Sequence, residues 1–149
     1  MARVHSTHPM KFLQLGFIPS SAGVALLVLR LWLGLTILLN HGLAKLTGFG
    51  EMAGKFPDPL HIGSTGSLAL AVLAEVVAAA FLALGLCTRF AALVLVIELG
   101  GAFCFVHGCV LSGAHGGELA FIYLAGFVTL FLAGGGCCTL DSKLAVSAK

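Results

Sequence analysis

The sequence predicts an all-α integral membrane protein, built as a four-helix antiparallel bundle across one bilayer. Of its 149 residues, 59% are hydrophobic and 9% are charged, whereas a soluble domain has about 25% charged residues. The mean hydropathy is +1.09. The apolar residues also gather into four stretches, each close to the roughly 20 residues that cross a hydrocarbon core. Such a composition cannot form a water-exposed surface.

The four stretches are predicted to be helices, because lipid offers no partners to unpaired backbone groups and the sequence lacks the two-residue alternation of barrel strands. The predicted spans are residues 22–39, 68–87, 90–106 and 119–138. With their connections they form a single transmembrane domain, residues 1–149. The first span is longer than a signal-peptide core and no small-x-small cleavage site follows it, so it is expected to be a retained anchor.

The connections differ in kind. Residues 40–67 combine glycines and Pro57 and Pro59 with apolar side chains such as Phe56, which indicates a loop lying in the membrane interface and broken by turns. Cys87-Thr88-Arg89 is so short that the second and third helices must form a tight antiparallel hairpin. The third connection, residues 107–117, is rich in Gly and His.

Orientation is predicted from the basic residues. Five basic residues lie on the side of the termini and the second connection: Arg3, Lys11, Arg89, Lys143 and Lys149. Two lie on the opposite side: Lys45 and Lys55. The positive-inside rule therefore places both termini in the cytoplasm. The net charge of +2 forms no basic stripe, so nucleic acid is excluded as a partner.

Three ionisable residues lie inside the predicted helices: Arg30, Glu75 and Glu98. Each is eight to eleven residues from the cytoplasmic end, a depth of roughly 12–17 Å at about 1.5 Å per residue. Because a charge costs about 2.5 kcal/mol or more there, the three are predicted to meet as a buried charge network in which one glutamate holds a proton. The alternative is a pinning ion pair between Arg30 and one glutamate, with the other bound to a carbonyl or Thr.

Histidines and cysteines collect at the predicted outer ends. His41, His107 and His115 are candidate metal or haem ligands, since imidazole suits copper, zinc and iron; the alternative is hydrogen-bonded interfacial histidines. Cys104 and Cys109 are either a disulfide or a pair of free thiols. Cys137 and Cys138 are expected to be free thiols, because adjacent cysteines strain the peptide between them when they bridge.

Several motifs together resemble the DoxX family. They are Arg30-Leu-Trp-Leu-Gly34, His41-Gly42-Leu-Ala-Lys45-Leu46, Ala74-Glu75, Leu84-Gly85-Leu86-Cys87-Thr88-Arg89 and Gly134-Gly135-Gly136 with Leu140-Asp141. The resemblance covers residues 29–144 and implies a four-helix protein of a bacterial or archaeal inner membrane, related to subunits of quinol oxidase and thiosulfate:quinone oxidoreductase. The positions that match the family pattern are Arg30, Gly34, Gly42, Lys45, Glu75, Gly85 and Arg89.

The leading functional hypothesis is a small membrane subunit of a respiratory or redox complex that docks partner subunits and borders a quinone or proton site. A quinone needs an apolar slot with one or two polar groups, and the candidates are Arg30, His41, Lys45 and Glu75. Catalysis by the chain alone is not expected, because the sequence has no nucleotide motif, CxxC or haem-attachment motif. The alternatives are a transporter-like or channel-like oligomer that handles protons or solutes, and a purely structural or assembly subunit.

Overall fold

The computed structural model describes residue 15, residues 21–113 and residues 116–147, with side chains described as far as residue 144. Within these residues every regular element is a helix. The elements in chain order are α2 (Ala22–Ile37), η1 (Leu38–Gly42), α3 (Leu43–Thr47), α4 (Phe49–Met52), α5 (Ser64–Val72), η2 (Leu73–Ala78), α6 (Ala79–Leu84), α7 (Thr88–Gly101), η3 (Ala102–Val106), α8 (Glu118–Ala133) and α9 (Leu140–Ser147).

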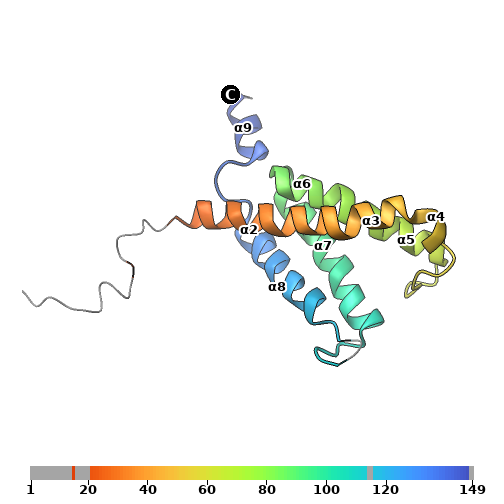
Figure 1. Ribbon diagram of the computed structural model, residues 1–149. Helices are drawn as coiled ribbons and strands as arrows, with labels where there is room; N and C mark the ends of the chain where they lie inside the picture. The colour runs from red at the N-terminus through yellow and green to blue at the C-terminus, as the bar shows by residue number, and fades with distance from the viewer. Residues whose placement is uncertain (1–14, 16–20, 114–115, 148–149) are drawn as a thin grey trace, which may run out of the picture.

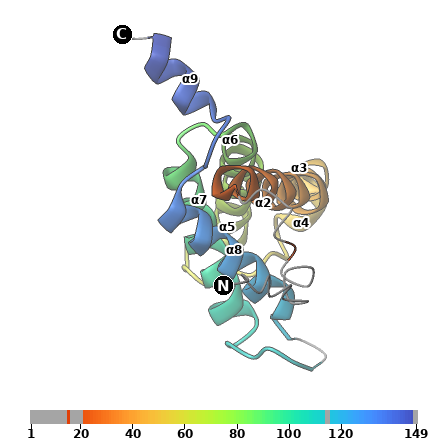
Figure 2. The ribbon, with the colours of Figure 1, turned by 90° about the vertical axis from the view of Figure 1, so that its left-hand side faces the viewer.

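The long helices form two antiparallel pairs. α2 and α3 run alongside α5 and α6, while α7 and α8 form a second pair that crosses the first obliquely (Figures 1 and 2). α9 leaves the bundle beyond the end of α8, and the short α4 lies at the opposite end (Figure 1). All-α membrane architecture, the fold class predicted from the sequence, is confirmed.

The packing is typical of helices in lipid. Alanines occupy much of the buried core, including Ala79 and Ala92 at 0% exposure, together with larger anchors such as Phe127 and Leu130. Large apolar side chains instead lie on the outer surface, where Trp32 is 73% exposed and Phe90 68% exposed. Small residues inside let helices approach closely, and an apolar exterior requires an apolar solvent. The bilayer is that solvent.

In the described part of the chain, three helices are long and apolar enough to cross a membrane: Ala22–Thr47, Ser64–Leu84 and Thr88–Val106. α8 is apolar but has 16 residues, so it is shorter than the predicted span of residues 119–138. The first span is longer than predicted, because the helix continues through η1 and α3 into the segment expected to be an interfacial loop. Residues 64–67 of that predicted loop likewise belong to α5.

The turn between the second and third spans is tight, as predicted. Gly85 ends α6 with φ +71°, and Cys87 precedes α7 with φ +45°. The Asp141 carboxylate accepts hydrogen bonds from the backbone N–H groups of Cys87 (2.9 Å) and Thr88 (3.3 Å). It thereby satisfies donors that a helix start leaves unpaired. The chain after α8 is thus joined to this hairpin turn.

Each of the three long helices contains a π-helical segment: η1, η2 and η3. A π turn accommodates one extra residue and is frequent at functional sites. His41 lies in η1, Glu75 in η2 and Cys104 in η3. The π-helical segments therefore carry three of the residues that the sequence indicates as candidates for a functional role.

Candidate functional site

A buried ion pair joins the first two membrane-spanning helices. The Lys45 Nζ atom lies 2.5 Å from each of the two carboxylate oxygens of Glu75. The Glu75 side chain is 2% exposed and that of Lys45 is 18% exposed. Contact with both oxygens at this distance is a strong charge-assisted interaction, so Lys45 is paired with Glu75.

Glu98 lies on α7 beside this pair and interacts electrostatically with both Glu75 and Lys45. Its Oε2 atom is buried and has no hydrogen-bond partner among the described residues. One ammonium group thus faces two carboxyl groups, and it contacts only the first of them. A buried polar atom without a partner is costly and calls for an explanation.

Glu98 also lines a cavity of about 360 Å³ between the loop after α4, α5–η2 and α7–η3. Glu98 provides a carboxyl group in a lining that is otherwise almost wholly apolar. The other lining residues are Phe56, Pro57, Pro59, Leu60, Ser67, Leu70, Ala71, Leu73, Ala74, Val94, Ile97, Gly101, Ala102, Phe105 and Val106. An apolar slot with one acidic group has the character of a site for a lipophilic ligand that carries a polar head.

The wall formed by the loop is held in place by Asp58. Its carboxylate accepts hydrogen bonds from the Ser67 hydroxyl (2.7 Å) and from the backbone N–H groups of Gly63 (2.8 Å) and Ile62 (3.1 Å). The Ser67 bond, with help from the two backbone bonds, lowers the pKa of Asp58 from its ordinary value of 3.8. Asp58 therefore pins the segment that carries Phe56, Pro57 and Leu60 to the start of α5.

The lowered pKa predicts how this loop responds to acid. A depressed pKa in the folded state means that the stabilisation is fully present above pH 3.8 and is lost as the pH falls through the lowered value. Asp58→Asn is therefore expected to speed amide hydrogen exchange at residues 58–63 several-fold at neutral pH and to remove the acid response. Protection factors corrected for intrinsic exchange rates provide the measurement. Glu51→Gln, at an exposed acid of α4, is the matched control, and equal exchange in the two variants would contradict the prediction.

Arg30 binds backbone carbonyl groups, whereas the sequence predicted that it forms a charge network with Glu75 and Glu98. Its Nη1 atom donates to the carbonyl oxygens of Leu82 (3.5 Å) and Ala83 (3.3 Å), and its Nη2 atom to that of Cys138 (2.8 Å). The last carbonyls of a helix have no partner within the helix, and the end of α6 offers them to Arg30. Glu75 meets Lys45 instead because α2 continues into α3. Among the residues that the structure describes, the ion pair within the bundle joins Lys45 and Glu75.

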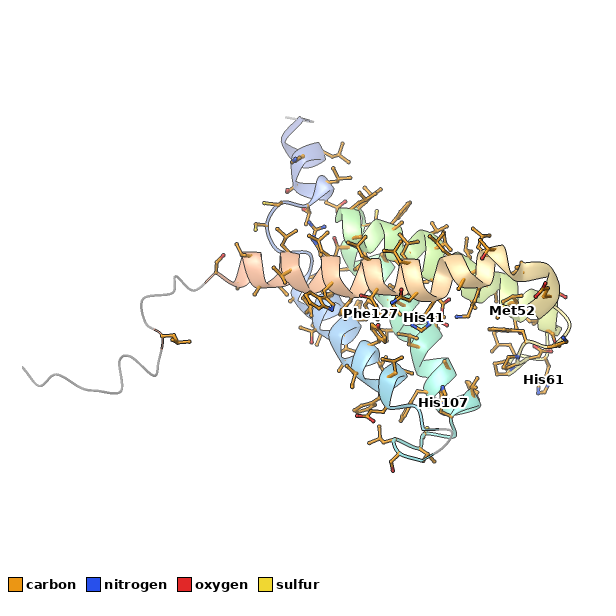
Figure 3. The ribbon with its side chains drawn as sticks, in the orientation of Figure 1. His41, Met52, His61, His107 and Phe127 are labelled. Carbon is orange, nitrogen blue, oxygen red and sulfur yellow. The ribbon has the colours of Figure 1, made fainter. Side chains whose placement is uncertain are left out.

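The outer histidines lie apart. The His41 ring meets the Tyr123 ring edge to face, with 6.1 Å between the ring centroids. The Tyr123 ring in turn stacks on that of Phe127, with 6.3 Å between the centroids. Figure 3 shows His41 near Phe127 in the middle of the bundle, His107 near the end of the third span and His61 in the loop beyond α4. Over residues 21–113 and 116–147, no three His, Cys, Asp or Glu side chains form a group suited to a metal ion. His115, the third predicted ligand, lies outside the described residues.

Comparison with known proteins gives two matches. Residues 25–108, more than half of the chain, match the sequence model of the DoxX family. A protein of Haemophilus influenzae named only as an uncharacterized protein is 35% identical over 112 residues, which cover 69% of this chain and 78% of that protein. No solved structure matches. The matched region contains Arg30, Lys45, Glu75 and Glu98.

Proposed function

The chain belongs to the DoxX family of membrane proteins, and from this premise we propose that it is a small integral subunit of a quinone-linked redox complex. The observation that carries the proposal is the apolar cavity beside Glu98. Its volume of about 360 Å³ lies within the range of small-molecule sites. Its position between membrane-spanning helices is the place where a quinone ring would enter from lipid.

Glu98 is the proposed partner of the quinone head group. The Glu98 carboxyl group, which lines the cavity, would accept a hydrogen bond from a quinol hydroxyl or, in its protonated form, donate one to a quinone carbonyl. The rings of Phe56 and Phe105 and the side chains of Ile97 and Leu70 would surround the apolar ring. Lys45 and Glu75, which the sequence suggested as direct ligands, are proposed to set the electrostatic field behind Glu98.

Electrons are proposed to come from another subunit. The sequence has no nucleotide-binding motif, CxxC or c-type haem attachment sequence, so the proposed role is to hold the quinone and dock a partner that carries a redox centre. Isolation in mild detergent, followed by mass spectrometry of bound proteins and lipids, tests this part. Co-purifying redox subunits and quinone are expected; a protein recovered with neither would contradict it.

A second function is favoured by the same three ionisable groups. Lys45, Glu75 and Glu98 lie together in the bundle interior, and intramembrane ionisable groups mark proton paths in transporters. Proton uptake into vesicles containing the purified protein, followed with an enclosed pH-sensitive dye, distinguishes the two functions. Uptake that Glu98→Gln abolishes, in the absence of any quinone, would favour proton transport over quinone binding.

The quinone site is tested with a photoreactive azido-quinone and the purified protein. Labelling is expected on the peptides around Phe56 and Phe105 and should be displaced by decylubiquinone. Glu98→Leu removes this hydrogen bond and leaves the quinone head group without its polar partner, which costs about 1–3 kcal/mol, so the quinone affinity is expected to fall roughly five-fold to a hundred-fold.

Glu118→Leu is the matched control, because Glu118 is an exposed glutamate at the start of α8. It should leave quinone labelling unchanged. Labelling at sites remote from the cavity, or an equal affinity in Glu98→Leu and the parent protein, would overturn the proposed site.

A further inference from the structure

Two cysteines meet at the end of the third membrane-spanning helix. The Sγ atoms of Cys104 and Cys109 lie 2.9 Å apart, with the Cys109 thiol donating to Cys104. Both residues are exposed. A disulfide has an S–S distance of about 2.05 Å, so less than about 1 Å of movement separates this contact from a covalent bond.

The backbone holds Cys109 in this position. The N–H of Cys109 donates to the Phe103 carbonyl (2.9 Å) and that of His107 to the Ala102 carbonyl (3.2 Å), which closes the end of η3. Gly108 and Cys109 adopt left-handed conformations with φ +60° and +58°. A non-glycine residue rarely occupies this region and does so at some cost. The turn folds the Cys109 side chain back over the last helical turn, where Cys104 lies.

We propose that Cys104 and Cys109 form a reversible dithiol–disulfide site that exchanges with small-molecule disulfides. One thiolate attacks a sulfur of the partner disulfide and releases one partner thiol. The second cysteine loses its proton and attacks the resulting mixed disulfide. The products are an intramolecular S–S bond and two reduced partner thiols, so two electrons pass to the partner.

The site is distinct from the other three cysteines. Cys87 follows α6, and Cys137 and Cys138 follow α8, at the end of the bundle where the hairpin turn lies. Direct bonding between the adjacent Cys137 and Cys138 would strain the peptide that joins them. With the orientation predicted from the basic residues, Cys104 and Cys109 face the exterior, where disulfides persist. The hydrogen bond to Cys104 raises the pKa of the Cys109 thiol, which keeps that thiol protonated in the resting pair.

Oxidised glutathione is the probe that tests this proposal. The full-length protein is reduced, equilibrated with a series of ratios of oxidised to reduced glutathione, quenched in acid and alkylated. Chymotrypsin cuts after Phe105, between the two cysteines, so their peptides stay joined only where a disulfide has formed. Joined peptides are expected at less oxidising ratios than any modification of Cys87, Cys137 or Cys138, on a single chain, and they should separate again on reduction.

Two variants provide the controls. In Cys104→Ser, Cys109 should form only a mixed disulfide with glutathione; Cys137→Ser should leave the Cys104–Cys109 linkage unchanged. Helix content measured by circular dichroism establishes that each variant is folded. The proposal fails if Cys104 and Cys109 stay alkylatable at ratios that oxidise the other cysteines, or if their linkage joins two chains. Neither result depends on whether a quinone binds.

Discussion

Lys45→Met is expected to destabilise the folded protein by about 3–5 kcal/mol, because it removes one partner of a buried ion pair and leaves the Glu75 carboxylate uncompensated. Both carboxylate oxygens of Glu75 contact Lys45, and the Glu75 side chain is 2% exposed. Water therefore cannot replace the lost ammonium group without opening the interface between the first two spans. The free energy of unfolding, measured in mixed detergent and SDS micelles, provides the test.

A double-mutant cycle separates the ion pair from other effects of the substitution. Glu75→Gln alone leaves Lys45 without its counter-charge and is expected to be destabilising as well, whereas Lys45→Met with Glu75→Gln should recover much of the loss. Lys55→Met, at an exposed lysine in the loop after α4, is the matched control and should change stability by less than about 0.5 kcal/mol. A Lys45→Met protein as stable as Lys55→Met would show that the pair is not formed.

Gly85→Ala is expected to cost about 3 kcal/mol or more, through two separate effects. A β-carbon at this position would collide with Nη1 of Arg30, and the backbone has φ +71°. The left-handed conformation alone costs an alanine about 1–2 kcal/mol. Arg30 must also withdraw, which breaks charged hydrogen bonds to the carbonyls of Leu82, Ala83 and Cys138, each worth about 1.5 kcal/mol or more.

The same micelle unfolding measurement checks this expectation. Gly50→Ala is the control, because a β-carbon there meets nothing within 4 Å and Gly50 lies inside a helix. In an Arg30→Met background the clash with the guanidinium is relieved, so Gly85→Ala should cost less and retain only the backbone contribution and the close approach of the β-carbon to the Thr139 Cα atom at 2.9 Å. An equal cost of Gly85→Ala in both backgrounds would mean that Arg30 does not occupy the position described.

Hydropathy and the short connection at Cys87-Thr88-Arg89 were enough to predict helices, a membrane environment and the hairpin of the second and third spans. The glycines and prolines of residues 40–67 indicate a loop broken by turns, so the sequence predicts that the first span ends at residue 39. The helix in fact continues to Thr47, because no proline or glycine pair interrupts it before Gly48. A lysine can lie within a membrane-spanning helix when a carboxylate on the neighbouring helix pairs with it, as Glu75 does with Lys45.

The candidate site was harder to predict. Depth along a helix indicated that Arg30, Glu75 and Glu98 share a layer, but depth does not specify the direction in which each side chain points. Arg30 instead binds the backbone carbonyl groups at the end of α6, which no side-chain pattern encodes. The π-helical segments also shift the helical phase within each span, as at Glu75 in η2, and sequence periodicity of 3.6 residues does not include such shifts. Asp58 was missed because its role depends on loop contacts with Ser67.

Unequal helix lengths have a consequence for the lipids around this protein. At about 1.5 Å per residue, the 26-residue first helix extends about 39 Å and the 16-residue α8 about 24 Å, against a hydrocarbon core of about 30 Å. The longer helix must tilt, whereas the membrane beside α8 must thin or draw in shorter acyl chains. One flank of the molecule therefore favours a different lipid thickness from the other, so membrane composition can bias which neighbours gather at α8.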